Sequence, residues 1–446
     1  MDIDTELPLD TNSHFSIVFP LPYRCLCLVG IGILGWASNL QGLYFLGIDT
    51  GYALNIRSTN TGLRTREGLA TTFAHPSTLY KPVYGLFLIY AVITLTSWLF
   101  FFLSSSGASP TTDSVKFIPS LTIISLLILL MAPWSILYRR ERATFLRASL
   151  RCLVPSFTQS IYFSDIILAD IFTSFAKVFG DFWLASIILI SNGHLWQLPE
   201  ETGLTQWITP CLMSLPYAVR LRQCIAEYVV TSSKRSLYNA LKYFTAFPVI
   251  FLSAAQRLVN DEKPHGEHPL FRVWVFFVFV NSIYSFWWDV TNDWGLTMFT
   301  FSSRKSKRKL STPATPMESR DRLISPYGST AALNAAGEDD LDGPSQAPGL
   351  RSHLLFSDPM IYYIAVFINF VLRFTWSLKL SSHLHHVADL EAGVFLIEGL
   401  EVLRRWIWVF LRVEWETLKL GKQPHNDEYE FLMREVGEED VSDVSM

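Results

Sequence analysis

Two adjacent arginines lie in the middle of an apolar stretch near the C-terminal end of the sequence. The stretch is VFLIEGLEVLRRWIWVFLRVEWE, residues 394–416, and the pair is Arg404 and Arg405. An arginine at the centre of a membrane-spanning helix costs roughly 2.5–3.5 kcal/mol on insertion scales. Two of them therefore require a partner or a hydrated cavity. Glu401 precedes them by three and four residues, so an ion pair within one helix is one explanation. An anion site is the other, because guanidinium groups bind phosphate and carboxylate through paired hydrogen bonds.

Further polar and charged side chains interrupt other apolar segments. They occur in DIILADIFTSFAK, YAVRLRQCIAEY, NALKYFTAFP and INFVLRFTWSL, and the candidates are Asp170, Thr173, Arg220, Lys242, Tyr243 and Arg373. Ionisable residues inside a membrane usually face the interior of a helix bundle or a transport pathway. Basic groups from several helices that converge on one cavity favour an anion over a cation, and Asp170 would position one of these bases. Arg220 and Lys242 lie near the ends of their segments, so snorkelling to the lipid headgroups remains an alternative.

A cluster of acidic and amide side chains occurs in SFWWDVTNDWGL. Asp289, Asn292 and Asp293 are spaced at i, i+3 and i+4, which places them on one helix face. We expect them to hold neighbouring helices or arginines and not to touch a ligand. Together with Glu401 they form the predicted structural polar cluster.

Composition identifies the chain as an integral membrane protein. It has 446 residues, of which 50% are hydrophobic, 14% aromatic and only 17% charged, whereas soluble domains carry about 25% charged residues. The formal net charge of −4 indicates no nucleic-acid partner. The fold class that follows is an all-α polytopic bundle embedded in a lipid bilayer.

Apolar runs long enough to cross about 30 Å of hydrocarbon predict nine crossings. They fall near 22–48, 79–103, 117–138, 157–190, 207–230, 237–258, 269–301, 355–381 and 391–418. The run 157–190 contains several charges and could be two short crossings, which would make ten. If this run is instead one long, tilted or broken crossing, the loops on one side of the membrane contain about 21 Lys and Arg and those on the other side contain about two. Basic loops stay cytoplasmic, so this count predicts a lumenal N-terminus and a cytoplasmic C-terminus.

The chain divides into segments by composition. Residues 302–354 change from basic to small and polar to acidic without an apolar period, so we expect a disordered cytoplasmic linker. The predicted divisions are a lumenal tail at 1–21, N-terminal transmembrane helices at 22–150, a second transmembrane domain at 151–418 that contains the linker, and an acidic cytoplasmic tail at 419–446.

Six motifs in order resemble one known family. The segments ADIFTSF, RLRQCIAEY, NALKY, WDVTNDWGL, VLRFTW and LEVLRRWIWVFLRVEWE are similar to those of the EXS domain, which eukaryotic phosphate exporters share with the fungal ER-retention-defective proteins of the Golgi. The resemblance covers roughly residues 150–418. Plasma-membrane exporters also carry a cytoplasmic SPX domain, whereas about 21 residues precede the first predicted crossing here, which favours the Golgi branch. Glu227-Tyr228-Val229 stands where those exporters have a basic Arg-Tyr-Arg pattern.

The resemblance implies a helical bundle that conducts inorganic phosphate from the Golgi lumen to the cytosol. This activity would support glycosylation and the retention of glycosyltransferases and ER residents, in a protein that stays in the Golgi or cycles with the ER. The implied phosphate ligands are Asp170, Thr173, Arg220, Lys242, Tyr243, Arg373, Arg404 and Arg405. The resemblance implies no cofactor. It leaves open whether the protein is a channel or a carrier, whether protons move with phosphate, and whether it forms a homodimer.

Two other classes of function compete with a transporter. A membrane enzyme with a di-metal centre would use histidine boxes, and SSHLHHVAD supplies a single one with His383, His385 and His386. Such centres need several boxes, so we expect no enzyme, no catalytic residue and no metal site. A non-transporting receptor could instead bind glycosyltransferase tails or the Golgi recycling machinery through the linker and acidic tail. A receptor of this kind has no need for arginines deep in the membrane.

The distribution of basic loops predicts where reporter tags should lie. A tag at residue 2 is expected in the lumen, and tags within 320–345 or after 440 are expected in the cytosol. Protease protection in sealed vesicles measures this directly. If both termini prove to be on one side of the membrane, the nine-crossing arrangement is wrong.

Overall fold

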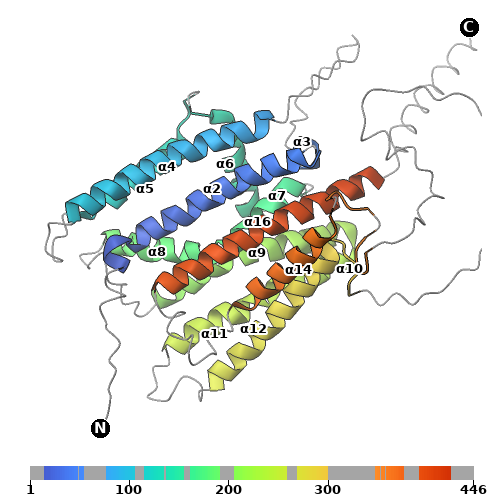
Figure 1. Ribbon diagram of the computed structural model, residues 1–446. Coiled ribbons are helices and arrows are strands. Elements are labelled where there is room, and N and C mark those ends of the chain that lie inside the picture. The colour runs from blue at the N-terminus through green and yellow to red at the C-terminus, as the bar shows by residue number, and fades with distance from the viewer. Residues whose placement is uncertain are drawn as a thin grey trace, which may run out of the picture.

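The structure is a computed structural model (Figure 1). It describes residues 15–48, 50–54, 77–105, 115–134, 137–154, 161–190, 205–258, 269–299, 347–351, 353–356, 358–375 and 391–422. All regular secondary structure in these ranges is helical. The all-α prediction is therefore confirmed for the described part of the chain.

The described helices divide between the two halves of the chain. The N-terminal half contains α2 (Leu21–Phe45), α3 (Thr50–Ala53), α4 (Ser77–Ser105), α5 (Phe117–Met131), α6 (Arg139–Leu153), α7 (Phe163–Ser174) and α8 (Ala176–Ile190). The C-terminal half contains α9 (Thr205–Thr231), α10 (Lys234–Phe244), α11 (Ala246–Leu258), α12 (Pro269–Trp288), the π-helix η2 (Asp289–Asp293), α14 (Met360–Arg373) and α16 (Glu391–Lys422).

Helices α2 and α16 occupy the middle of the bundle. In Figure 1, α4 and α5 flank α2 on one side, and α14, α11 and α12 lie beyond α16 on the other. Arg24 pairs with Glu391 near the start of both helices, and Gly42 faces Phe410 further along, so α2 and α16 run parallel. Tyr90 donates to the carbonyl of Leu26, which belongs to the antiparallel contact of α4 with α2.

Several helices are interrupted along their length. Helices α7 and α8 meet at Phe175 with a bend of 61°, α10 and α11 are separated at Thr245, and α12 continues into the π-helix η2. A π-helix shifts the residues that follow it around the helix axis and is frequent at functional sites. Interrupted helices expose backbone polar groups, which a membrane protein tolerates where they are buried in protein or line a cavity.

Three helices are long and apolar enough to cross a membrane by themselves, within the described residues. They are α2, α4 and the continuous segment 269–293, and the bent pair α7 and α8 makes a fourth if it is one span. Helices α5 and α14 are apolar but have only 15 and 14 residues. Helix α9 contains Pro210 and Pro216. Each predicted crossing overlaps a helix or a helix pair among the described residues, and the number nine remains a prediction.

Two segments between predicted crossings contain ordered structure that the sequence did not indicate. Residues 139–151 lie in the helix α6, whose Arg142 is buried and donates to the carbonyls of Leu129 and Ala132 at the end of α5. Regular contacts also resume before the predicted end of the linker, since Leu350 is buried in the core and Arg351 pairs with Glu414 at 2.6 Å. The rest of the linker up to 346, the tail from 423 and His383, His385 and His386 lie outside the described residues.

Close contact between α2 and α16 generates a test of stability. A Cβ atom on Gly42 would lie 2.6 Å from the ring of Phe410, whereas a Cβ on Gly35 would lie 3.5 Å from Trp406, an ordinary contact. We expect Gly42→Ala to lower the free energy of unfolding by about 1–3 kcal/mol through overpacking. Gly35→Ala is the matched control and should be neutral or stabilising, because alanine favours helix.

Thermal unfolding of both variants in detergent, followed by tryptophan fluorescence, measures the difference. Equal stability of Gly42→Ala and Gly35→Ala would show that Phe410 moves aside at little cost and that this contact does not limit the approach of α2 and α16.

Candidate functional site

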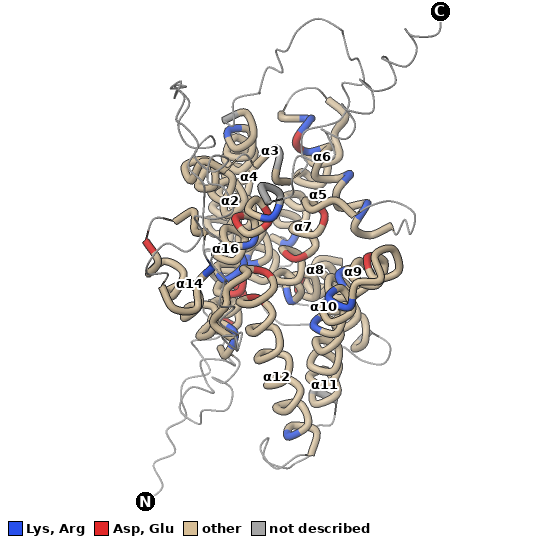
Figure 2. The backbone as a smooth tube through the Cα atoms, turned by 90° about the vertical axis from the view of Figure 1, so that its right-hand side faces the viewer, with Lys and Arg blue, Asp and Glu red and all other residues tan. Residues whose placement is uncertain are grey.

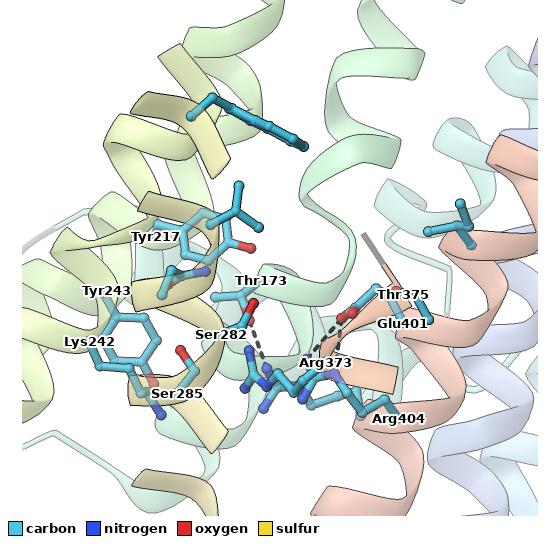
Figure 3. Close-up of a pocket in the computed structure, with 15 residues that line it drawn as sticks. Thr173, Tyr217, Lys242, Tyr243, Ser282, Ser285, Arg373, Thr375, Glu401 and Arg404 are labelled. Carbon is cyan, nitrogen blue, oxygen red and sulfur yellow. Dashed lines mark hydrogen bonds and ion pairs between the residues drawn. The ribbon is translucent and has the colours of Figure 1, made fainter. Parts of the chain in front are cut away.

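A cavity of about 310 Å³ lies among α7, α9, α10, α12, α14 and α16 (Figure 3). Its charged lining consists of Lys242, Arg373, Arg404 and Arg405 against the single carboxylate of Glu401. Hydroxyl and amide groups of Thr173, Tyr217, Tyr243, Asn281, Ser282, Ser285 and Thr375 complete the polar lining. The wall therefore has an excess of positive charge and many hydrogen-bonding groups. Figure 2 shows acidic and basic positions interleaved around α16 in the middle of the bundle.

Arg404 lies at the centre of this wall. Its Nε and Nη2 atoms donate to Glu401 Oε2 at 3.1 and 2.9 Å, so the ion pair within α16 exists. The pair does not use the whole guanidinium group. Arg404 Nη1 is buried and has no hydrogen-bond partner among the described residues, and the same holds for Arg373 Nε. Buried donors are normally satisfied, so these two nitrogen atoms keep unused hydrogen-bonding capacity.

Asp289 neutralises part of the positive charge of the cavity wall, although it does not line the cavity itself. It is fully buried, it accepts a hydrogen bond from Arg373 Nη2 at 2.7 Å, and its carboxyl oxygens lie 3.7 Å from both Lys242 Nζ and Arg404 Nη1. Asn369 donates to it at 3.5 Å. The carboxylate stands at the start of the π-helix η2, where α12 changes its pitch. One carboxylate thus serves cations from three helices.

Asp293 and Asn292 complete the predicted structural cluster at the other end of η2. Asp293 accepts a hydrogen bond from Lys242 Nζ at 3.2 Å and lies 3.9 Å from Arg412 Nε. The amide nitrogen of Asn292 donates to Thr291, and its backbone carbonyl accepts from Arg235. Both residues lie outside the cavity lining, as does Asp289, whereas Glu401 lines it.

Arg405 differs from Arg404 in its partners. Its Nη2 and Nε atoms donate to the hydroxyls of Thr173 and Ser174 at 2.9 and 3.0 Å. Its guanidinium carbon lies 4.5 Å from the ring centre of Trp408, a cation–π distance. No carboxylate in the described residues lies within ion-pair distance of Arg405. Neutral groups therefore hold the guanidinium of Arg405 in place, and its charge contributes directly to the positive potential of the cavity.

Asp170 and Arg220 form a second layer behind Tyr243. Asp170 Oδ1 accepts hydrogen bonds from Arg220 Nε at 2.9 Å and from the Tyr243 hydroxyl at 2.5 Å. Arg220 also donates to Gln223 Oε1 at 2.6 Å. Neither Asp170 nor Arg220 lines the cavity. Their contact with Tyr243 fixes the position of a phenol that does line it.

The structure brings six of the eight predicted phosphate ligands to the cavity wall. These are Thr173, Lys242, Tyr243, Arg373, Arg404 and Arg405. The snorkelling alternative for Arg220 and Lys242 is wrong, because both side chains are buried in ion pairs with carboxylates of other helices. Asn281, Ser282 and Ser285 of α12 line the cavity but are not among the predicted ligands. The segment VNSIYSFWW places these polar residues in an otherwise apolar helix, which is the signal that could have identified them. The described residues contain no group of three or more metal-binding side chains.

Comparisons with known proteins agree with the motif order. The EXS family model matches residues 19–418. Protein ERD1 homolog 1 of Schizosaccharomyces pombe is 28% identical over 420 residues, which cover 92% of this chain and 94% of that protein. Protein ERD1 of Kluyveromyces lactis is 30% identical over 59% of this chain and 61% of its own length. Solute carrier family 53 member 1 of Homo sapiens is 26% identical over 65% of this chain and 37% of its own length.

The shared carboxylate of Asp289 generates a prediction about stability. Asp289→Asn leaves Arg373, Lys242 and Arg404 buried with one negative charge fewer, and we expect it to lower the free energy of unfolding by about 3–5 kcal/mol. Asp293→Asn is the matched control and should cost less, because Arg412 keeps its bond to Glu416 at 2.7 Å. Thermal unfolding of the two purified variants gives the comparison, and an Asp289→Asn protein as stable as wild type would contradict the assigned role.

Proposed function

The chain belongs to the EXS family, and from this premise we propose that it is a membrane transporter that carries inorganic phosphate from the Golgi lumen to the cytosol. The observation that supports this most directly is the cavity wall, where four cations face one carboxylate. Two guanidinium nitrogens, Arg373 Nε and Arg404 Nη1, retain unused hydrogen-bonding capacity there. An oxyanion with several acceptor oxygens matches this set of donors.

The size and the chemistry of the cavity favour a small anion. A volume of about 310 Å³ is at the lower end of the roughly 300–1,000 Å³ of ordinary ligand pockets. Hydroxyls of Ser282 and Ser285 face the basic residues (Figure 3) and could bond the protonated oxygen of a phosphate monoanion or the oxygens of a dianion. The Tyr243 hydroxyl donates its proton to Asp170, so it could accept a hydrogen bond from the protonated oxygen of a monoanion. In this proposal Arg404 is the direct phosphate ligand. Arg373 and Arg405 supply positive potential, and Asp170 orients Tyr243 and Arg220.

The proposal includes an orientation and a biological setting. Nine crossings with a lumenal N-terminus and a cytoplasmic C-terminus place the N-terminal end of α16 on the lumenal side. Phosphate removal from the lumen would then support glycosylation and, through it, the retention of Golgi and ER proteins. A non-transporting receptor for glycosyltransferase tails is the alternative. Its candidate binding segments, most of the linker and the acidic tail, lie outside the described residues.

Substitutions at Arg404 test the ligand assignment. Arg404→Lys keeps the charge and loses the planar guanidinium, so it should weaken phosphate flux. Arg404→Gln removes a charged hydrogen bond worth about 1.5–3 kcal/mol, roughly ten- to more than a hundredfold in affinity, and should nearly abolish flux. Arg412→Gln is the matched control two turns along α16, outside the cavity lining, and should retain flux. Phosphate uptake into proteoliposomes, normalised to monodisperse protein, is the measurement.

A purely structural role for Arg404 makes a different forecast. If Arg404 serves only to pair with Glu401, Glu401→Gln should be as harmful as Arg404→Gln, and the double variant should recover activity. The ligand assignment predicts instead that the double variant stays inactive, because Arg404 Nη1 is lost in it. Wild-type flux in Arg404→Gln would refute the assignment, and absence of phosphate flux in the wild-type protein would favour the receptor.

A further inference from the structure

A second charged cluster lies where α2, α8 and α16 meet, outside the lining of the cavity. Its members are Arg24, Lys177, Asp181, Glu391 and Glu398. Arg24 Nη2 bonds Glu391 Oε2 at 2.8 Å near the surface, where the side chain of Glu391 is 24% exposed. Glu391 balances the charge of Arg24 in this pair. The remaining three groups are one ammonium and two carboxylates, so the cluster carries one negative charge more than it can pair.

Lys177 does not satisfy both of its acidic neighbours. It bonds Asp181 directly within α8, and its Nζ atom lies 3.8 Å from Glu398 Oε1, beyond hydrogen-bond distance. The side chain of Glu398 is 9% exposed. Its Oε1 atom is buried and finds no hydrogen-bond partner among the described residues. Glu398 and Asp181 therefore lie on either side of the same ammonium group, which bonds only Asp181.

Two buried carboxyl groups that share one ammonium group do not both ionise readily, because each charge disfavours the other and burial disfavours both. A proton on Glu398 removes this repulsion and makes its carboxyl group a hydrogen-bond donor. We propose that Glu398 binds one exchangeable proton beside Asp181, and that occupancy of this proton site favours phosphate binding in the neighbouring cavity. The coupling rests on the proposed phosphate transport, whereas the proton site does not.

The connection to the cavity runs through two helices. On α16, Glu398 lies between Ile397 and Glu401, which line the cavity, and Arg405 follows seven residues later on the same face, about 10 Å along the axis. On the bent pair, Lys177 follows Thr173 and Ser174, the acceptors of Arg405, across the bend at Phe175. A bound proton removes one negative charge near the arginines and so favours an anion there. By linkage, bound phosphate raises the affinity for the proton.

The neighbours of the pair limit which groups could titrate in its place. The charged and titratable side chains that face Glu398 are Arg24 and Cys25 from α2, Lys177 and Asp181 from α8, and Glu391, Glu401 and Arg405 along α16. Arg24 is engaged by Glu391, and Glu401 by Arg404. In the proposed orientation the pair lies on the lumenal side of the arginines, so lumenal pH would set its occupancy.

Phosphate flux at different lumenal pH tests the coupling. In wild-type proteoliposomes we expect flux to rise about three- to tenfold from mildly alkaline to mildly acidic lumenal buffer, as one charge about 10 Å away would produce at an intermediate effective dielectric constant. Glu398→Gln, a neutral mimic of the protonated side chain, should keep the high flux and lose this component. Glu391→Gln is the control and should titrate like wild type. The titration of phosphate itself is common to all three proteins and cancels in the comparison.

An infrared measurement on the purified protein detects the proton without transport. A band from a protonated carboxyl group should be present at neutral pH, disappear in both Glu398→Gln and Asp181→Asn, and persist in Glu391→Gln. If wild-type protein shows this band but no phosphate flux, the proposed transport fails and the proton site stands. If the band is absent at every pH, or if Glu398→Gln shows the wild-type pH dependence of flux, the proposal is overturned.

Discussion

The buried carboxylate of Asp289 is the interaction on which the centre of this bundle depends. It has no exposed surface, it bonds Arg373, and it lies within ion-pair distance of Lys242 and Arg404. Those cations come from α10, α14 and α16, which approach each other around this one group. Uncompensated charges at this depth would cost several kcal/mol each. The π-helix η2 presents Asp289 towards α14 and α16 and Asp293 towards Lys242, so one irregular turn serves both ends of the charged centre.

Compensation by Asp289 is incomplete, and the proposed anion site rests on this incompleteness. Among the described residues, Arg405 has hydroxyl and aromatic partners and no carboxylate, and Arg373 and Arg404 each keep one nitrogen without a hydrogen-bond partner. A cluster selected for stability alone would add carboxylates until the charges balanced, as the Asp170 and Arg220 pair does behind Tyr243. The wall of the cavity instead keeps an excess of positive charge.

Sequence reasoning predicted much of this centre because charge in an apolar segment is conspicuous. The importance of the arginines of α14 and α16, and the role of Asp289 as their acidic partner, follow from the residue types and from the cost of burying them. The pairing of Asp170 with Arg220 behind the cavity wall could not be predicted, because it depends on how helices that are distant in the sequence pack against each other. The helix α6 was not predicted either, because a segment rich in arginine is typical of a polar loop. In the structure Arg142 donates to the carbonyls at the end of α5. The linker ends early because Leu350 and Arg351 find buried partners, which composition does not reveal.

The bend between α7 and α8 connects the two charged centres, and α2 makes room for it. A Cβ on Gly32 would lie 2.6 Å from the ring of Phe175, so the absence of a side chain lets the bend sit against α2. One half of the pair offers Thr173 and Ser174 to Arg405, and the other carries Lys177 and Asp181 towards Glu398. In a straight helix, the directions of these two sets of side chains would be fixed relative to a single helix axis. Because of the bend, each half contacts a different part of α16. The arginines and the two carboxyl groups therefore lie at separate positions along that helix and do not neutralise each other.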